Sequence, residues 1–121
     1  MSAHLYCWAP SLDLDPEAPD FQDKLGALLE EEAPPAPSPR LVAFVEELLP
    51  RYPDLTETED TVWAMGPLVN CIVGDFIDMP MTWSRCVEAV PFIIETALKH
   101  GLHCYEPQGG SFVPAPTAGA G

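Results

Sequence analysis

Residues 83–108 read WSRCVEAVPFIIETALKHGLHCYEPQ, and this stretch decides the predicted fold. Apolar side chains recur at helical spacing from Val87 to Leu98, which predicts a helix with one hydrophobic face. Gly101 follows the last periodic residues, where a glycine commonly ends a helix in a left-handed conformation. The apolar segment His103-Cys104-Tyr105 comes directly afterwards and is typical of a β-strand. A helix that runs straight into a strand predicts an α+β protein.

The other apolar segments supply further helices and strands. The pattern predicts helices at 21–29, 39–49 and 83–100, and strands at 4–8, 62–65, 70–77 and 103–105. Ser38-Pro39 is a typical helix start, because serine caps the helix and proline fits its first position. Gly66-Pro67 would join the two middle strands into a hairpin, and residues 79–82 would form a loop before the last helix.

These elements predict an α+β fold with a mixed four-stranded sheet. Along the chain, the order of elements is β-α-α-β-β-α-β. We expect the three helices mainly on one face of the sheet, since their apolar stripes need a common surface. The other face would then be only partly covered. Residues 1–113 are predicted to form a single domain, and 114–121 a flexible tail rich in alanine, glycine and proline.

The strongest compositional feature is acidity. The 121 residues include 19 acidic side chains against five lysines and arginines, a formal net charge of -14. Residues 1–60 hold 14 of the acidic side chains and three of the basic ones. Such a charge repels nucleic acid and anionic membranes and speeds encounter with a basic protein. The plainer interpretation is solubility alone.

Other sequence features exclude several classes of protein. No segment resembles a signal peptide, and no apolar run reaches the roughly 18 residues of a membrane span, so we expect a cytoplasmic protein. The cysteines are scattered among apolar neighbours without a Cys-x-x-Cys pair, which favours buried thiols over disulfides or a metal site. We therefore expect no metal, no cofactor and no catalytic residue.

Polar residues inserted among apolar ones are the candidates for a binding site. Asp75 and Asp78 lie between hydrophobic residues near Trp83, and aromatic side chains flanked by carboxylates are typical of interface hot spots. Asp78 and Ser84 also fit a strand-to-helix cap. Partly covered aromatic side chains on the open sheet face would form a partner site. The candidate binding residues are Trp8, Trp63, Asp75, Asp78, Trp83, Tyr105 and Glu106.

Three segments carry a resemblance to a known group of proteins. They are Leu5-Tyr6-Cys7-Trp8, Trp83-Ser84-Arg85 and residues 100–108, HGLHCYEPQ. Together they resemble small uncharacterised bacterial α+β proteins, whose last segment often reads Cys-Tyr-Asp-Pro-Gln where this chain has Glu106. Some of those proteins are similar to immunity proteins of polymorphic toxin systems. The resemblance covers the two ends and the last helix, and it implies no catalytic residue.

Two main functional hypotheses follow. The first is a non-enzymatic protein-binding module, most concretely an acidic immunity-type inhibitor whose carboxylates imitate the phosphates sought by a basic toxin. The second is a small enzyme or ligand-binding domain that uses Asp75, Asp78 and His103 around a pocket at the sheet edge. The missing nucleophile motif, phosphate loop and metal ligands count against the second. A third interpretation is a structural homodimer formed across the open sheet face.

Overall fold

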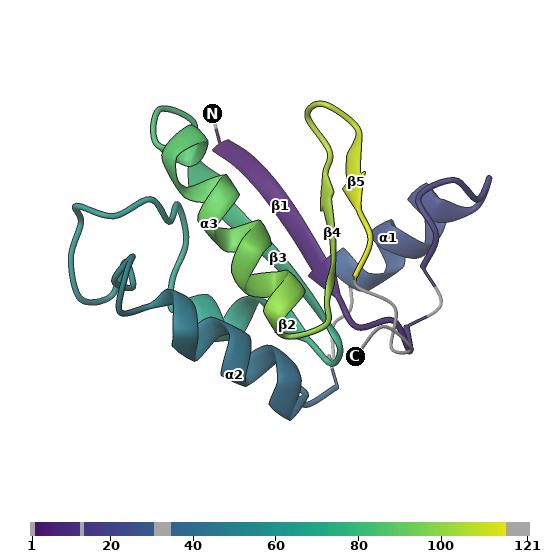
Figure 1. Ribbon diagram of the computed structural model, residues 1–121, viewed down its shortest axis with the longest axis horizontal. Helices are drawn as coiled ribbons and strands as arrows, with labels where there is room; N and C mark the ends of the chain where they lie inside the picture. The colour runs from purple at the N-terminus through teal and green to yellow at the C-terminus, as the bar shows by residue number, and fades with distance from the viewer. Residues whose placement is uncertain (1, 13, 31–34, 116–121) are drawn as a thin grey trace.

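The computed structural model describes residues 2–12, 14–30 and 35–115, which form an α+β fold (Figure 1). Its elements in chain order are β1 (Ser2–Trp8), α1 (Phe21–Leu29), α2 (Pro39–Leu48), the 3-10 helix η1 (Leu68–Cys71), β2 (Ile72–Val73), β3 (Phe76–Thr82), α3 (Cys86–Lys99), β4 (His103–Glu106) and β5 (Ser111–Val113). The α+β class and the three helices confirm the prediction. Most of the predicted tail, 116–121, lies outside the described residues.

The sheet has five strands in the order β2-β3-β1-β4-β5. All neighbouring strands are antiparallel, with β1 at the centre between β3 and β4. The prediction of a mixed, four-stranded sheet was therefore wrong. Residues 111–113, which we read as the end of the domain, pair with β4 and add the fifth strand.

The predicted central hairpin was also wrong. Trp63 makes only an isolated bridge to Met81, and residues 68–71 form η1 in place of a strand. The true hairpin joins β2 to β3 at Gly74, whose positive φ of 61° suits a tight turn. The predicted loop at 79–82 is the second half of β3, although it contains Pro80. Proline usually indicates a break in a strand because it cannot donate a backbone hydrogen bond.

One face of the sheet packs against α2 and α3. Leu5, Cys7 and Met79 project from β1 and β3 into this core, which includes Phe44 of α2 and Ile93 of α3. Leu41, Phe44, Val45 and Leu48 of α2 are buried, and Ser38 accepts a hydrogen bond from the backbone N–H of Leu41 as an N-cap. We call this the α2/α3 face.

The opposite face packs against α1, so the helices do not share one face as predicted. Tyr6, Trp8 and Phe76 alternate with the core residues along their strands and contact Phe21 and Leu25 of α1. Figure 1 shows α1 apart from the α2–α3 pair, toward the β4–β5 edge. A nine-residue helix is only about 14 Å long, so α1 covers part of this face. We call it the α1 face.

The last long helix, α3, uses a different stripe from the one predicted. Its buried residues are Ala89, Ile93, Thr96 and Ala97. Val87 is 79% exposed, because the helix begins at Cys86 and turns its first residues away from the sheet. The predicted end at Gly101 is confirmed, with a φ of 71° and the N–H of Leu102 donating back to the carbonyl of Ala97.

Candidate functional site

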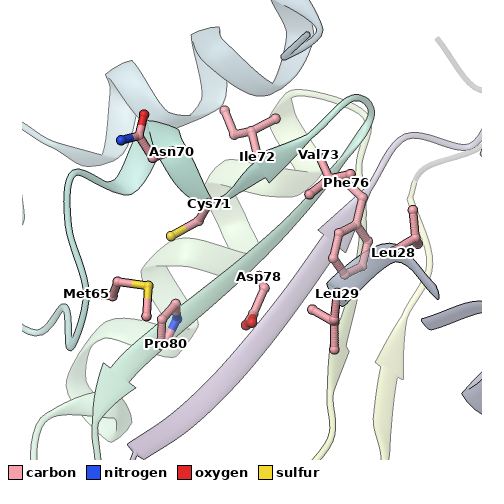
Figure 2. A pocket seen from close by; sticks show the side chains of 10 residues that line it. All are labelled: Leu28, Leu29, Met65, Asn70, Cys71, Ile72, Val73, Phe76, Asp78 and Pro80. Atoms are coloured by element: carbon pink, nitrogen blue, oxygen red, sulfur yellow. The ribbon is translucent and has the colours of Figure 1, made fainter. Parts of the chain in front are cut away.

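A pocket of about 250 Å³ lies on the α1 face beside the β2–β3 edge (Figure 2). Its lining residues are Leu28, Leu29, Met65, Asn70, Cys71, Ile72, Val73, Phe76, Asp78 and Pro80. They come from the end of α1, from the segment that leads through η1 into β2, and from β3. Figure 2 shows Asp78 near the middle, with Leu29 on one side and Cys71 on the other. We call this cavity the Asp78 pocket.

The alternation of side chains along β3 places the carboxylate there. Phe76, Asp78 and Pro80 project to the α1 face, while Ile77 and Met79 enter the opposite core. A carboxylate on the other face would lie among apolar side chains at a large desolvation cost. On the α1 face it keeps some contact with solvent, since the Asp78 side chain is 23% exposed.

His4 holds Asp78 in a defined orientation. The Nδ1 atom of His4 lies 2.8 Å from Oδ1 of Asp78, so the imidazole N–H donates to the carboxylate. The two residues lie diagonally across the β1–β3 pair, where side chains can reach one another. The side-chain amide of Gln108 in turn brackets His4, because it accepts from the backbone N–H and donates to the backbone carbonyl. The C-terminal Glu106-Pro107-Gln108 motif thus supports the site indirectly.

The electrostatics of the pocket keep its neighbours neutral. Burial, followed by the nearby charges of Asp78 and Asp54, raises the pKa of the Cys71 thiol to about 11. Burial, followed by Asp78 and Tyr105, raises the pKa of Tyr6. At neutral pH the thiol is protonated and the phenol is uncharged. Around Asp78 the pocket therefore offers one carboxylate among neutral, partly apolar groups.

The lysine and arginine side chains of the chain are all engaged elsewhere. Lys24 pairs with Asp20, Arg40 with the Gly101 carbonyl, Arg51 with the Tyr52 and Phe92 rings, Arg85 with Asp60 and Glu88, and Lys99 with Glu47. All five lie in the described part of the chain, and none lines the Asp78 pocket. The last turn of α1, which ends at the pocket, also lacks a basic residue. The negative end of the helix dipole therefore adds to the negative potential there.

Two of the predicted binding residues are buried, so their predicted exposure was wrong. Trp8 is 0% exposed and stacks on Phe76 and Phe112, and it packs with Phe21 of α1 on the part of the face that this helix covers. Trp63 is 1% exposed and donates a hydrogen bond from Nε1 to the carbonyl of Tyr52. Neither side chain presents a surface to a partner.

The remaining predicted residues lie at separate places. Asp75 is in the β2–β3 turn, where its backbone carbonyl accepts from Ala9, and Trp83 is 51% exposed before α3. Tyr105 packs edge-on against Phe21, and the Glu106 carboxylate accepts from the Gly109 N–H. Of the seven predicted residues, only Asp78 lines the pocket.

The predicted ligand site of Asp75, Asp78 and His103 does not form. His103 lies on β4, two strands away from β3, and its Nδ1 accepts a hydrogen bond from the backbone N–H of Ala115. Burial lowers the pKa of His103. A pocket does lie beside the β2–β3 edge, and of these three residues only Asp78 lines it. The sequence analysis did not identify Leu29, Met65 and Cys71 as lining residues. For β3, the alternation of side chains from Phe76 to Pro80 could have shown which residues share a face with Asp78.

The described residues support no metal centre and no membrane span. Within them, no group of three or more histidine, cysteine, aspartate or glutamate side chains could hold a metal ion. No helix in that part of the chain is both long and apolar enough to cross a bilayer. Comparison with protein-family models, curated proteins and solved structures finds no match. The resemblance to immunity proteins therefore stays a prediction.

Proposed function

We propose that this protein is a non-enzymatic module that binds a basic protein through the α1 face around the Asp78 pocket. The observation that carries the proposal is the carboxylate of Asp78 in a pocket that no lysine or arginine of the chain enters. A carboxylate set among apolar groups attracts a cation more strongly than one in open water. The net charge of -14 extends this attraction to longer range.

Exposed apolar side chains beside the pocket support a protein partner. Leu29 and Met65 line the pocket and are 43% and 57% exposed, and Val69 in the adjoining η1 is 36% exposed. Apolar side chains around a charged group can exclude water from it, as the contacts around an interface hot spot do.

The more specific role that we propose is inhibition of a basic toxin, as the resemblance to immunity proteins implies. An acidic inhibitor can occupy the site that the toxin uses for a phosphate backbone, because its carboxylates carry the same charge. The distribution of charge fits this role, with 14 of 19 acidic residues in the first 60 positions.

The chemistry of the pocket favours binding over catalysis. A thiol with a pKa of about 11 is a poor nucleophile at neutral pH, so Cys71 is not set up for covalent catalysis. The pocket lacks His103 and Asp75, which the enzyme hypothesis needed. His4 orients Asp78 from the neighbouring strand but does not itself line the pocket.

Co-expression tests the proposal. If a gene next to this one encodes a toxin with a basic domain, the protein should restore growth to cells that express that domain. Met65→Glu should abolish the rescue, because it places a charge on the apolar rim. Val87→Glu is the matched control, since Val87 is also an exposed apolar residue, at 79% against 57% for Met65, but lies on α3. Survival equal to that with an empty vector, or equal loss of rescue in both variants, would contradict the proposal.

A further inference from the structure

The Asp78 pocket has the size of a site for one side chain. Pockets that enclose drug-sized ligands measure about 300–1,000 Å³, and this one measures about 250 Å³. Its base carries a carboxylate, and its rim carries Leu29 and Met65. A group that fits must therefore have an apolar stem and a cationic end.

We propose that the pocket receives an arginine side chain of the basic partner, an inference that rests on the proposed function. Leu29, Met65 and Phe76 would pack against the methylene groups of the arginine stem. The guanidinium group would reach the carboxylate of Asp78 at the base. Asn70 also lines the pocket, but Figure 2 shows its amide pointing away from Asp78, so Asp78 is the side chain that would hold the guanidinium group.

Three features favour arginine over lysine. A guanidinium is planar and carries five donors, so it can serve the carboxylate and a second acceptor together, whereas an ammonium is a compact point charge. It is also more weakly hydrated, and it enters an apolar-walled pocket at a lower desolvation cost. The hydrogen bond from His4 to Oδ1 holds the carboxylate in one orientation before the partner arrives. Such preorganisation reduces the entropy lost on binding.

The negative end of α1 strengthens the same preference for a cation. Leu28 and Leu29 form the last turn of this helix and line the pocket, and no basic residue of the chain occupies that turn. The backbone carbonyls at the end of a helix carry a partial negative charge. The cation would thus lie between a carboxylate and a helix C-terminus.

Nuclear magnetic resonance with small probes tests this inference directly. The 15N-labelled protein is titrated with N-acetyl-arginine methylamide, with the citrulline analogue, which has the same shape but no charge, and with the lysine analogue. We expect saturable shifts at the amides of Leu29, Asn70, Cys71 and Asp78 with the arginine probe. The citrulline analogue should bind at least about tenfold more weakly, because it cannot form the charged pair, and lysine should lie between the two.

Two pairs of variants make the result specific. Asp78→Asn should abolish the shifts, whereas Asp75→Asn, which removes the same charge from the same hairpin outside the pocket, should leave them unchanged. Leu29→Lys places a competing ammonium at an exposed rim position, and Val87→Lys is its control on α3. The first should weaken probe binding about tenfold and the second should not. Folding of each variant is checked from the dispersion of its spectrum.

The possible results separate this inference from the proposed function. Equal binding of the citrulline analogue, equal weakening in Asp75→Asn, or shifts scattered over the acidic surface would overturn the arginine site. Partner rescue that survives Asp78→Asn but is lost in Met65→Glu would overturn the arginine site and leave binding through the α1 face standing. Saturable binding of the arginine probe without any rescue would instead overturn the proposed function alone.

Discussion

Alternating residues of the same strands form two faces of the sheet, and the two faces are packed differently. The α2/α3 face receives Leu5, Cys7 and Met79 and is closed by two helices into an apolar core. The α1 face receives Tyr6, Trp8 and Asp78, and one short helix covers only part of it. The first arrangement maximises burial of apolar area. The second leaves a carboxylate and apolar side chains at the surface, where they can contact another molecule.

The two faces differ in how strongly the stability of the fold depends on their side chains. A side chain in the closed core must match its neighbours in volume, because protein interiors are packed nearly as densely as crystals. A side chain on the rim of the pocket has no such constraint. Leu29 and Met65 are exposed at this rim, so we expect them to contribute little to the free energy of unfolding.

The largest expected effect comes from the same substitution on the two faces. Leu48→Ala removes a side chain that is 0% exposed in the α2/α3 core, so it should lower the free energy of unfolding by about 2–5 kcal/mol. Leu29→Ala at the pocket rim should lower it by less than about 1 kcal/mol. Urea unfolding followed by circular dichroism measures both. An equal decrease in the free energy of unfolding in both variants would show that Leu29 is packed as tightly as a core residue.

A second prediction concerns the loop that carries part of the pocket. Asp54 is buried, and its carboxylate accepts from the backbone N–H groups of Leu68 and Thr56 at 2.9 and 3.3 Å. Asp54→Ala leaves these donors unpaired and should lower the free energy of unfolding by about 1–3 kcal/mol. It should also broaden the resonances of the segment around Met65. Glu59→Ala, in the same loop but exposed, is the control and should change neither quantity.

The third prediction tests the electrostatic coupling within the pocket. Because the pKa of Cys71 is about 11, only about 0.1% of its thiol is ionised at pH 8, and alkylation by iodoacetamide should be slow. The rate should rise about tenfold per pH unit up to that pKa. Asp78→Asn removes one cause of the raised pKa and should increase the rate at pH 8 severalfold. Mass spectrometry of the labelled peptides gives the rates.

Cys7 and Cys104 provide the comparison on the other face. Their sulfur atoms lie 3.3 Å apart in the α2/α3 core, and burial raises the pKa of Cys7 well above its ordinary value. Neither thiol should react until the protein unfolds. Rapid labelling of Cys7 in the native protein would contradict the closed packing of this face.

Local patterns predicted the helices well. The apolar spacing of α2, together with Ser38-Pro39, gave its start and its buried stripe, because both depend on residues close in sequence. The strands of the sheet were harder to predict from local patterns. Pro80 interrupts the usual signal for a strand, so β3 was divided into a strand and a loop, and its neighbour β2 has only two residues.

The site could be predicted only in part, for a related reason. Asp78 stood out as a polar residue among apolar ones, which is a local signal. Leu29 and Met65 reach it from distant parts of the chain, and only the placement of α1 on the second face brings them there. That placement also buries Trp8, which the sequence pattern left exposed. Helix placement follows from tertiary packing, and no local pattern determines it.

The smallest expected effect belongs to an ion pair that joins the two helices of the closed face. Glu47 on α2 accepts hydrogen bonds from Lys99 and, at 3.0 Å, from Nε2 of His100, and these bonds lower its pKa. Stability from Glu47 is therefore fully present above the ordinary glutamate pKa of about 4.3 and is lost as the pH falls through the lower folded value. Glu47→Gln should reduce the urea midpoint slightly at pH 7 in low salt.

The difference in urea midpoint between Glu47→Gln and the wild-type protein should become smaller below pH 4 and in 1 M salt. Protonation removes the charge of Glu47, and salt screens it. Glu46→Gln is the matched control, since Glu46 is exposed on the same turn of α2. If Glu46→Gln lowers the urea midpoint more than Glu47→Gln does, or if the decrease in Glu47→Gln persists in acid, the ion pair does not stabilise the packing of α2 against α3. In that case apolar contacts alone would hold the closed face together, and the contrast between the two faces would become sharper.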